Sequence, residues 1–347
     1  MKKIVFASTN QYAGKTSIIA GIAKSTGEKF GYLKPLGDKL IYKKKRLWDY
    51  DSALIASLFN LEELPEDMSI GFDHSKLRYM YDRNMIKEKV IEFAKHSGKE
   101  KNLLLVEGGG DITYGKSVYL DAISIAKYLE ASFVLVTSGS DNVILDNLAH
   151  FEGYIKALKE EVDFTGVIIN KIQDVDDFKQ SHFDIISKMG IRVLGIVPYR
   201  QELTYITAGY VAEKLFAKVV AGEGGLGKII KTVLVGAMSV PNAMKHPAFK
   251  EEKKMIITSG DRSDMILAAI ETNSSCVVIT NDILPPANII SKASQHNIPL
   301  LAVPWETFYT AKQIDDMEKL LTKEDNEKLE ILSDLSKKYL DLSAIIK

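Results

Sequence analysis

The sequence predicts an α/β fold in which a doubly wound parallel sheet is followed by a second, smaller α/β domain. Short apolar, β-branched runs alternate with segments of helical periodicity, which is typical of parallel strands covered by helices on both faces. The strands expected in the first part of the chain are residues 4–7, 32–36, 103–106, 132–137, 165–169 and 191–197. The helices expected among them include residues 17–24, 86–95, 121–129 and 176–188. Ligands of such sheets bind beyond the carboxyl ends of the strands.

The loop after the first strand has the residues of a triphosphate-binding site. Residues 7–17 read Ala-Ser-Thr-Asn-Gln-Tyr-Ala-Gly-Lys-Thr-Ser and lead into the first helix. Gly14-Lys15-Thr16 at a helix start brings backbone N–H groups, an ammonium and a hydroxyl around one anionic pocket, the arrangement of a P-loop. Thr9 stands where the usual spacing has its first glycine. We therefore expect a P-loop NTPase-type sheet; the alternative is an ordinary strand-to-helix turn.

This loop predicts a bound nucleoside triphosphate, ATP or another purine triphosphate, with Mg²⁺ as its counterion. The residues expected to contact the nucleotide are Asn10, Gln11, Tyr12, Ala13, Gly14, Lys15, Thr16 and Ser17 in the loop and Asn170 after the fifth strand. An amide at the position of Asn170 is placed to bond a base that lies across the sheet edge. For Asn170 an ordinary polar turn is the alternative.

Three residues are candidate Mg²⁺ ligands, because Mg²⁺ prefers oxygen donors in octahedral geometry. Thr16 offers a hydroxyl. Glu107 follows the third strand directly, and the three glycines after it would let a ligand approach the backbone. Asp51 opens a helical stretch at 52–58, where capping that helix is an equal alternative, and Asp49 is a weaker candidate ligand.

Two lysines are candidate catalytic residues. Lys34 ends the second strand and is followed by Pro35, which fixes the turn. Together with Lys15 it would neutralise a transferring phosphoryl group, which is the electrostatic role that such sites need. The alternative for Lys34 is a surface lysine at a strand end.

A second αβ pattern begins after residues 221–228, which read AGEGGLGK. We interpret this stretch as an inter-domain turn, although it also spells G-x-x-x-x-G-K, because Ile229 replaces the Mg²⁺-binding hydroxyl. The later strands are expected at residues 233–236, 255–258, 276–280 and 299–303, with helices at 262–272, 288–296 and 308–321. At 347 residues the chain exceeds the usual size of one domain. The expected organisation is a nucleotide-binding domain at 1–210, a smaller α/β domain at 211–325 and a helical tail at 326–347.

The second domain has one conspicuous polar string at a strand-to-helix junction. Asp261 and Arg262 lie there, and they are the candidate ligand site of this domain. An arginine in the first turn opposes the helix dipole, so it suggests a compensating anion or carboxylate. The alternative is a helix capped by Ser259 or Asp261 with an exposed arginine.

Composition restricts the class of partner. The formal net charge of −1 gives no overall attraction to nucleic acid or to a membrane surface, and the basic cluster at 39–46 is interpreted as a solvated loop. The single Cys276 excludes a disulfide framework. No apolar run suits a membrane span, so we expect a cytoplasmic protein. A homodimer is expected because two-fold assemblies are the commonest oligomers.

Six motifs in fixed order resemble the dethiobiotin synthetase-like P-loop family. They read STNQYAGKT, GYLKPLG, DYDSAL, LLLVEGGGD, GVIINK and GIVPY, and they extend from residue 1 to about 205. This family includes cobyrinic acid diamide synthases and the amino-terminal domain of long phosphotransacetylases. The resemblance implies that Lys15, Thr16 and Lys34 contact phosphate. It further implies that Asp51 and Glu107 bind Mg²⁺ and that Asn170 recognises the base.

Residues 215–325 resemble a DRTGG domain. The segments that carry this resemblance are VLVGAMS at 233–239 and SGDRSD at 259–264, of which only Asp261 and Arg262 match the name-giving motif. Such domains are generally interpreted as regulatory or ligand-binding. Both halves together look like the amino-terminal part of long phosphotransacetylases without the acyl-transfer domain. We therefore do not expect phosphate acetyltransferase activity from this chain alone.

Three functions are compatible with these features. The first is a regulatory or metabolite-sensing protein, in which nucleotide in the first domain changes the binding of a small molecule or a protein partner by the second. The second is an ATP-dependent ligase-type enzyme that activates a small carboxylate by phosphoryl transfer. The third is a degenerate fold without nucleotide binding. An enzyme requires a closed polar pocket beyond Glu107, whereas a sensor does not.

Overall fold

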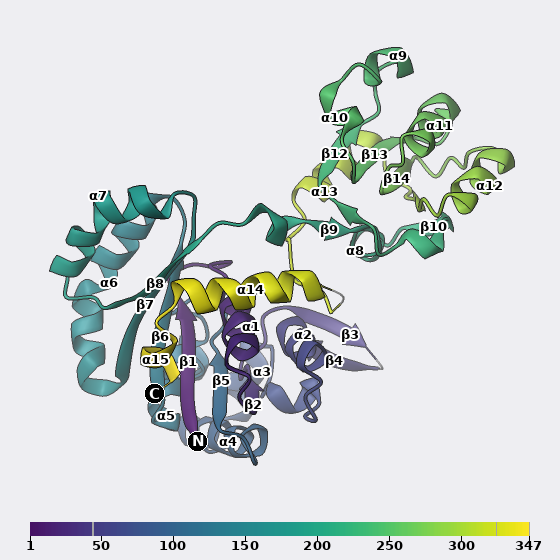
Figure 1. Cartoon of the computed structure of the whole chain (residues 1–347). Coiled ribbons are helices and arrows are strands. Elements are labelled where there is room, and N and C mark those ends of the chain that lie inside the picture. Colours follow the sequence, from purple (N-terminus) through teal and green to yellow (C-terminus); the bar gives the residue numbers. More distant parts are fainter. Residues whose placement is uncertain (44, 324, 347) are drawn as a thin grey trace. The chain divides into compact units, whose positions relative to one another are not determined.

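The computed structural model describes residues 1–43, 45–323 and 325–346, without the side chains of residues 43 and 155–161. The chain folds into two compact units (Figure 1). The first unit comprises Met1–Arg200 and the C-terminal residues from Asp325 onward, and the second extends from Gln201 to residue 324. The contacts thus divide the chain at residue 200, not at 210. The sequence predicted the tail as a separate segment, and here it is part of the first unit.

The first unit is built on a parallel six-stranded sheet in the order β2-β5-β1-β6-β7-β8. Its strands are β1 (Lys2–Ser8), β2 (Phe30–Leu33), β5 (Leu103–Glu107), β6 (Ser132–Ser138), β7 (Asp163–Ile172) and β8 (Val193–Pro198). All six strands expected from the sequence are present. Strands β2, β5 and β6 are buried along their whole length, and β1 is buried from Ile4 onward, which explains their continuous apolar runs.

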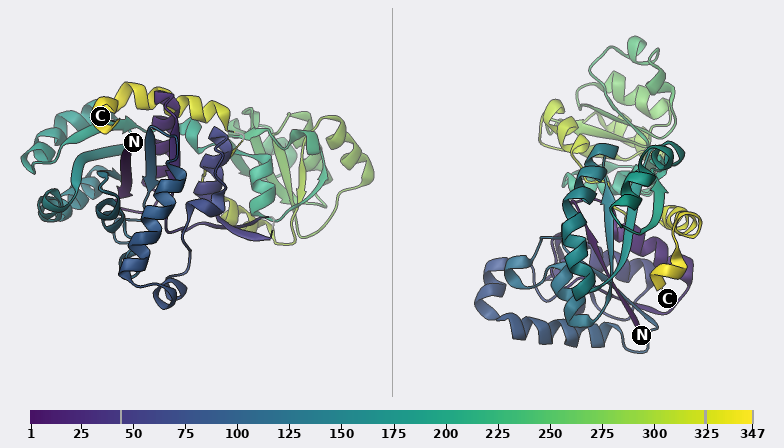
Figure 2. Two further views of the ribbon diagram at one scale, coloured as in Figure 1. Left: turned by 90° about the horizontal axis from the view of Figure 1, so that it is seen from below. Right: turned by 90° about the vertical axis from the view of Figure 1, so that its left-hand side faces the viewer.

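Helices cover both faces of this sheet, as the sequence predicted. They are α1 (Lys15–Thr26), α4 (Arg83–Ser97), α5 (Ala122–Leu129), α6 (Asp141–Glu161) and α7 (Val175–Lys188). Figure 2 shows α1 on one face and the α4–α5 pair on the other. An excursion after β2 contains α2 (Tyr50–Phe59), α3 (His74–Met80) and the 3-10 turn η1 (Pro65–Met68), and a second 3-10 turn, η2 (Lys116–Val118), precedes α5. The basic cluster at 39–46 is not a plain loop, because β3 (Leu40–Lys43) and β4 (Arg46–Asp49) pair antiparallel there.

The second unit has a five-stranded sheet in the order β10-β15-β14-β13-β12. Its strands are β10 (Lys218–Ala221), β12 (Thr232–Val235), β13 (Lys254–Ser259), β14 (Cys276–Thr280) and β15 (Leu300–Ala302). Its helices are α8 (Ala208–Lys214), α9 (Val240–Ala243), α10 (Pro247–Lys250), α11 (Ser263–Glu271), α12 (Ala287–Gln295) and α13 (Thr307–Asp315). Four of the strands are parallel and match the predicted positions, while β10 pairs antiparallel at the edge. Cys276 is buried.

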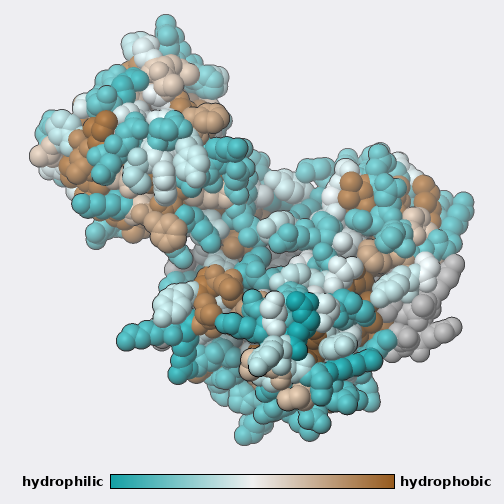
Figure 3. Space-filling view, turned by 180° about the vertical axis from the view of Figure 1, so that it is seen from behind, coloured by the Kyte–Doolittle hydropathy of each residue, from teal (hydrophilic) through white to brown (hydrophobic). Residues whose placement is uncertain are grey.

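The glycine-rich stretch at 221–228 lies inside the second unit and is not an inter-domain turn. It joins β10 to the short strand β11 (Ile229–Ile230), which pairs with β9 (Ile206–Thr207). A strand and not a helix follows Lys228 directly, so this stretch lacks the strand-to-helix context of a P-loop. Within the described ranges, no helix combines the length and apolar character needed to cross a bilayer. The hydropathy of one face is drawn in Figure 3.

The C-terminal helices complete the first unit. Helix α14 (Asn326–Tyr339) lies along α1 in both Figure 1 and Figure 2, and α15 (Leu342–Ile346) follows it. Gly21 of α1 permits this contact, because a Cβ there would lie 2.4 Å from Ser336 Oγ and 2.6 Å from the Leu332 carbonyl oxygen. The helix that starts at the P-loop can therefore pack closely against α14 because residue 21 has no side chain.

The substitution Gly21→Ala is expected to lower the free energy of unfolding by about 1–3 kcal/mol, the usual cost of overpacking. The matched control is Gly153→Ala on α6, where an added Cβ meets nothing within 4 Å. There alanine should be neutral or stabilising by up to about 1 kcal/mol because of its helix propensity. Urea unfolding of both variants measures the difference. Equal effects would contradict the close α1–α14 contact.

Candidate functional site

The start of α1 presents unused backbone donors at the carboxyl edge of the sheet. Gly14 is the N-cap residue with φ 98°, and no side chain caps the helix. Among the described residues, no hydrogen bond uses the backbone N–H groups of Gly14, Lys15, Thr16 or Ser17. A helix start with free N–H groups and the positive end of the helix dipole attracts an anion.

Lys15 is buried directly beside this helix start. Its side chain is 7% exposed, and Nζ donates to Ser8 Oγ at 2.8 Å and to the Gly110 carbonyl oxygen at 3.1 Å. Burial lowers the pKa of Lys15 below its ordinary value, although the carboxylate of Glu107 opposes that shift. The ammonium is thus held between neutral acceptors, which an anion can supplement.

Glu107 links the end of β5 to the P-loop. Its Oε1 accepts a hydrogen bond from Thr16 Oγ1 at 2.9 Å, and its Oε2 accepts one from Tyr32 Oη at 2.8 Å. Burial, together with the negative charge of Asp51, raises the pKa of Glu107 to about 7. The structure thus brings together Thr16 and Glu107, the two candidate Mg²⁺ ligands, and the pair offers two oxygens at one point.

Lys34 is buried among three carboxylates. Its side chain is 1% exposed, and Nζ lies 2.5 Å from Asp38 Oδ1, 2.5 Å from Asp51 Oδ2 and 3.3 Å from Asp49 Oδ2. Burial alone would lower the pKa of Lys34, but the carboxylates of Asp51 and Asp49 raise it well above its ordinary value. Lys34 is a buried, paired cation here and not a surface lysine.

The two aspartates at the start of α2 have different roles. Asp49 caps the helix by accepting from the backbone N–H of Ser52 at 3.1 Å, so Asp51 is not the N-cap residue. Burial raises the pKa of Asp49. For Asp51 burial acts in the same direction, but the ammonium of Lys34 outweighs it and lowers the pKa. Carboxylate oxygens of Asp38, Asp49 and Asp51 lie within 4.8 Å of one another, and the lysine supplies the positive charge among them.

The far side of the P-loop is tied to the end of β7. Asn170 Nδ2 donates to the Ala13 carbonyl oxygen at 2.9 Å, and its Oδ1 accepts from the backbone N–H of Lys171. Lys171 Nζ donates to the Tyr12 carbonyl oxygen at 2.7 Å. Both ends of the Asn170 amide are thus used within the protein. Recognition of a base by Asn170 stays a prediction, and it would require these bonds to be exchanged.

The remaining loop residues fall into two groups. Tyr12 is about half exposed, with Lys39 Nζ 5.7 Å from its ring centroid, and Gln11 is also exposed. Asn10 and Thr9 bond each other through their side chains, and Thr9 Oγ1 also lies 2.9 Å from Thr137 Oγ1. Thr9 has no positive φ, so glycine is not required at this position of the loop.

The glycines after Glu107 serve internal packing. A Cβ at Gly109 would lie 2.2 Å from the ring of Tyr114, and one at Gly108 would lie 2.9 Å from the Cβ of Ala122. At both positions the absent side chain makes room for other parts of this chain. These contacts, and not the approach of a ligand, account for glycine there. Gly110 differs because its carbonyl oxygen accepts from Lys15.

Sequence reasoning missed three contributors to the site. Asp38 pairs with Lys34 from four residues further along, Tyr32 holds Glu107, and Gly110 bonds Lys15. The signal for Asp38 was present, because a lysine at the end of a buried strand requires an opposite charge close by. Tyr32 gave no signal beyond its place in an apolar strand.

In the second unit Arg262 is fully engaged. Its guanidinium pairs with Asp264 at 3.0 Å and donates to the carbonyl oxygens of Gly236 and Met238. Arg262 is itself the N-cap residue of α11, so neither Ser259 nor Asp261 caps this helix. The predicted compensating carboxylate is Asp264, in the first turn. Asp261 and Arg262 lie at the carboxyl end of β13, as expected from the sequence.

Comparison with known proteins also divides the chain into two parts, with the boundary between residues 207 and 210, close to the boundary predicted from the sequence. The family model described as an AAA domain matches residues 2–207, which is more than half of the chain. The model described as a DRTGG domain matches residues 210–317. The MinD cell division protein of Aquifex aeolicus aligns with 58% of this chain and 84% of its own, at 17% identity and a TM-score of 0.37.

The curated relatives are phosphate acetyltransferases. That of Pseudomonas putida is 23% identical over 362 residues, covering 98% of this chain and 51% of the relative. That of Synechocystis sp. is 23% identical over 344 residues, covering 94% of this chain and 48% of the relative. The chain spans about half the length of the relatives that it matches. It belongs to the AAA domain family, in its dethiobiotin synthetase-like P-loop form, and carries a DRTGG domain after it.

Proposed function

We propose that the first unit binds Mg²⁺ and a purine nucleoside triphosphate, ATP in the first instance, and that the bound nucleotide regulates the second unit. The observation that carries this proposal is the uncapped start of α1 beside the buried ammonium of Lys15 and the Thr16–Glu107 pair. A polyphosphate supplies the acceptors that the free N–H groups at the helix start and the ammonium of Lys15 can bond. The match to the AAA domain family supports the same ligand class.

The balance of charge at the sheet edge supports a divalent cation. The interacting groups are three ammonium groups, Lys15, Lys34 and Lys39, and four carboxylates, Asp38, Asp49, Asp51 and Glu107. When all are ionised, three positive charges against four negative ones leave an excess of one negative charge. Thr16 and Glu107 are the residues that would hold Mg²⁺, and Asp51 would join them after release from Lys34. The ion would neutralise charge on the triphosphate.

The engagement of Lys34 favours regulation over phosphoryl transfer. To stabilise a transferring phosphoryl group, its ammonium would have to leave both Asp38 and Asp51 at 2.5 Å. A buried carboxylate that loses its partner cation is costly, by about 3–5 kcal/mol. The enzyme hypothesis requires Lys34 to leave both aspartates. Nucleotide binding at α1 and Lys15 requires at most that Asp51 exchange Lys34 for Mg²⁺, which leaves this carboxylate paired with a cation.

For the second unit we propose ligand or partner binding at the carboxyl edge of its sheet. Asp261 and Arg262 lie at this edge, and Asn281 and Asp282 follow the neighbouring strand β14 with φ values of 65° and 54°. Non-glycine residues with positive φ cost free energy and are commoner at functional sites. The match to the DRTGG domain supports this assignment.

Replacing Lys15 by alanine is expected to weaken MgATP binding by about 10- to 100-fold, because a charge-assisted contact to phosphate is lost. Isothermal titration of the full chain measures the affinity. Removing Mg²⁺ with EDTA should also weaken binding of the wild type.

The matched control is Lys29→Ala. Lys29 is an exposed lysine that directly precedes β2, so it lies at the opposite edge of the sheet. Its removal subtracts the same charge and should leave the affinity unchanged. Equal affinities of the Lys15 and Lys29 variants would place the nucleotide elsewhere. Absence of binding by the wild type would refute the proposal.

Turnover separates a regulator from a ligase. Phosphate release from ATP is expected to be slow, and a panel of small carboxylates should not increase it, because Lys34 stays paired with its aspartates. A continuous phosphate-release assay on the full chain measures both rates. Stimulation by one carboxylate, abolished by Lys15→Ala, would establish the ligase-type activity instead.

The raised pKa of Glu107 predicts a pH dependence of the free protein. Between about 4.5, its ordinary pKa, and about 7 the folded state keeps a proton that the unfolded chain has released. In EDTA, the contribution of Glu107 to the free energy of unfolding should therefore fall as pH rises through this window. Urea unfolding of wild type and Glu107→Gln from pH 4.5 to 8 isolates it by difference. Parallel curves would show that Glu107 is ionised throughout.

A further inference from the structure

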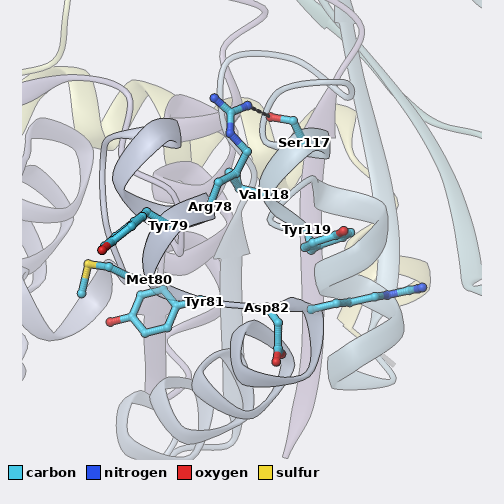
Figure 4. Close-up of a pocket in the computed structure, with 9 residues that line it drawn as sticks. Arg78, Tyr79, Met80, Tyr81, Asp82, Ser117, Val118 and Tyr119 are labelled. Carbon is cyan, nitrogen blue, oxygen red and sulfur yellow. Dashed lines mark hydrogen bonds between the residues drawn. The ribbon is translucent and has the colours of Figure 1, made fainter.

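A second pocket lies in the first unit, away from the P-loop residues. It has a volume of about 480 Å³, is open to solvent, and is lined by residues from the end of α3, the start of α4 and the turn η2 (Figure 4). Pockets for small ligands typically measure about 300–1,000 Å³. Val118 is buried, and the side chains around it are mainly arginine and tyrosine. None of these residues takes part in the nucleotide site described above.

Two guanidinium groups in this pocket have no carboxylate partner. Arg78 Nη1 donates to the neutral Ser117 Oγ at 3.3 Å, and the Arg83 guanidinium lies 5.9 Å from the ring centroid of Tyr119. Within the described ranges neither arginine forms an ion pair. The nearby carboxylate of Asp82 is used to cap α4, accepting the backbone N–H groups of Asn84 and Met85. The charged residues of the lining are thus two arginines and one aspartate, which give the pocket a net positive charge.

Tyrosine rings line both sides of the same pocket. Figure 4 shows Tyr79 and Tyr81 on one side and Tyr119 on the other. Tyr79 is 92% exposed and Tyr119 is 41% exposed, so both rings are accessible. Tyr119 is held at φ 58°, a conformation that costs free energy for a bulky residue. Exposed rings beside guanidinium groups suit a flat ligand, because both rings and guanidinium planes stack on π-systems.

We propose that this pocket binds a small aromatic oxyanion, an aryl phosphate or aryl carboxylate. The anionic group contacts Arg78 and Arg83, and the ring stacks against Tyr119 and the tyrosines opposite. Arginine is suited to both parts of such a ligand, since its planar fork bonds oxyanions and its face stacks on rings. This site goes beyond the nucleotide-binding function and does not depend on it.

The test measures the binding of two probes, 4-fluorophenyl phosphate and 4-fluorobenzoate, to the full chain by ¹⁹F NMR. Lys15→Ala serves as the background, so that binding of phosphate at the P-loop is weakened. At least one probe should bind saturably. Arg78→Gln and Arg83→Gln should each weaken its binding by about tenfold, the effect of one charge-assisted hydrogen bond. Both arginines are exposed, so the variants should keep the fold.

The matched control is Lys87→Gln, an exposed cation of α4 that does not line the pocket. It should leave the affinity unchanged. The ring requirement is tested with inorganic phosphate and the charge requirement with 4-fluorophenol; each should bind more weakly than the intact probe. The proposal is overturned if neither probe binds, if the arginine variants bind like their parent, or if inorganic phosphate competes as well as the aryl phosphate.

Discussion

The first unit depends on the balance of buried charge at the carboxyl edge of its sheet. Parallel strands end there together, so Lys34 after β2 and Glu107 at the end of β5 are brought close to Lys15 at the start of α1. Isolated charges in such a place would be too costly, and each lysine or carboxylate is held by a partner. Because the carboxylates outnumber the ammonium groups, burial and mutual repulsion raise the pKa of Glu107. Proton uptake and divalent-cation binding are alternative ways to remove the same excess charge.

Hydrogen bonds within the protein hold the P-loop from both sides. Asn170 and Lys171 hold the carbonyl oxygens of Ala13 and Tyr12 from β7, while Lys15 bonds Gly110 on the β5 side. With its carbonyl groups bonded outward, the loop leaves its N–H groups free, and these are the groups that an anion uses. A preorganised donor array loses little entropy on binding. Packing of α14 along α1 restrains the helix behind the loop.

Local sequence signals specified the strands and the loop but not the partners of buried groups. Alternating apolar runs predict strands because a parallel sheet buries both faces, and Gly14-Lys15-Thr16 carries its chemistry in three adjacent residues. Tyr32 acts through Glu107, a neighbour that only the folded chain supplies. Likewise the amphipathic tail predicts a helix, yet its docking on α1 depends on the missing side chain of Gly21. The periodicity of apolar residues predicts local helices and strands, but it does not predict which distant segments pack together.

One loop connects the P-loop with the arginine–tyrosine pocket. Gly110 near its start accepts from Lys15, and Ser117 and Tyr119 near its end contact Arg78 and Arg83. Between them Tyr114 packs edge-on against His74 of α3, with ring centroids 5.0 Å apart, and covers Gly109. Ile112, Val118 and Leu120 anchor this loop in the core, so a shift at one of its ends would disturb the other. If the loop takes different positions with and without nucleotide, binding at the two sites is coupled, and linkage requires each ligand to change the affinity of the other by the same factor.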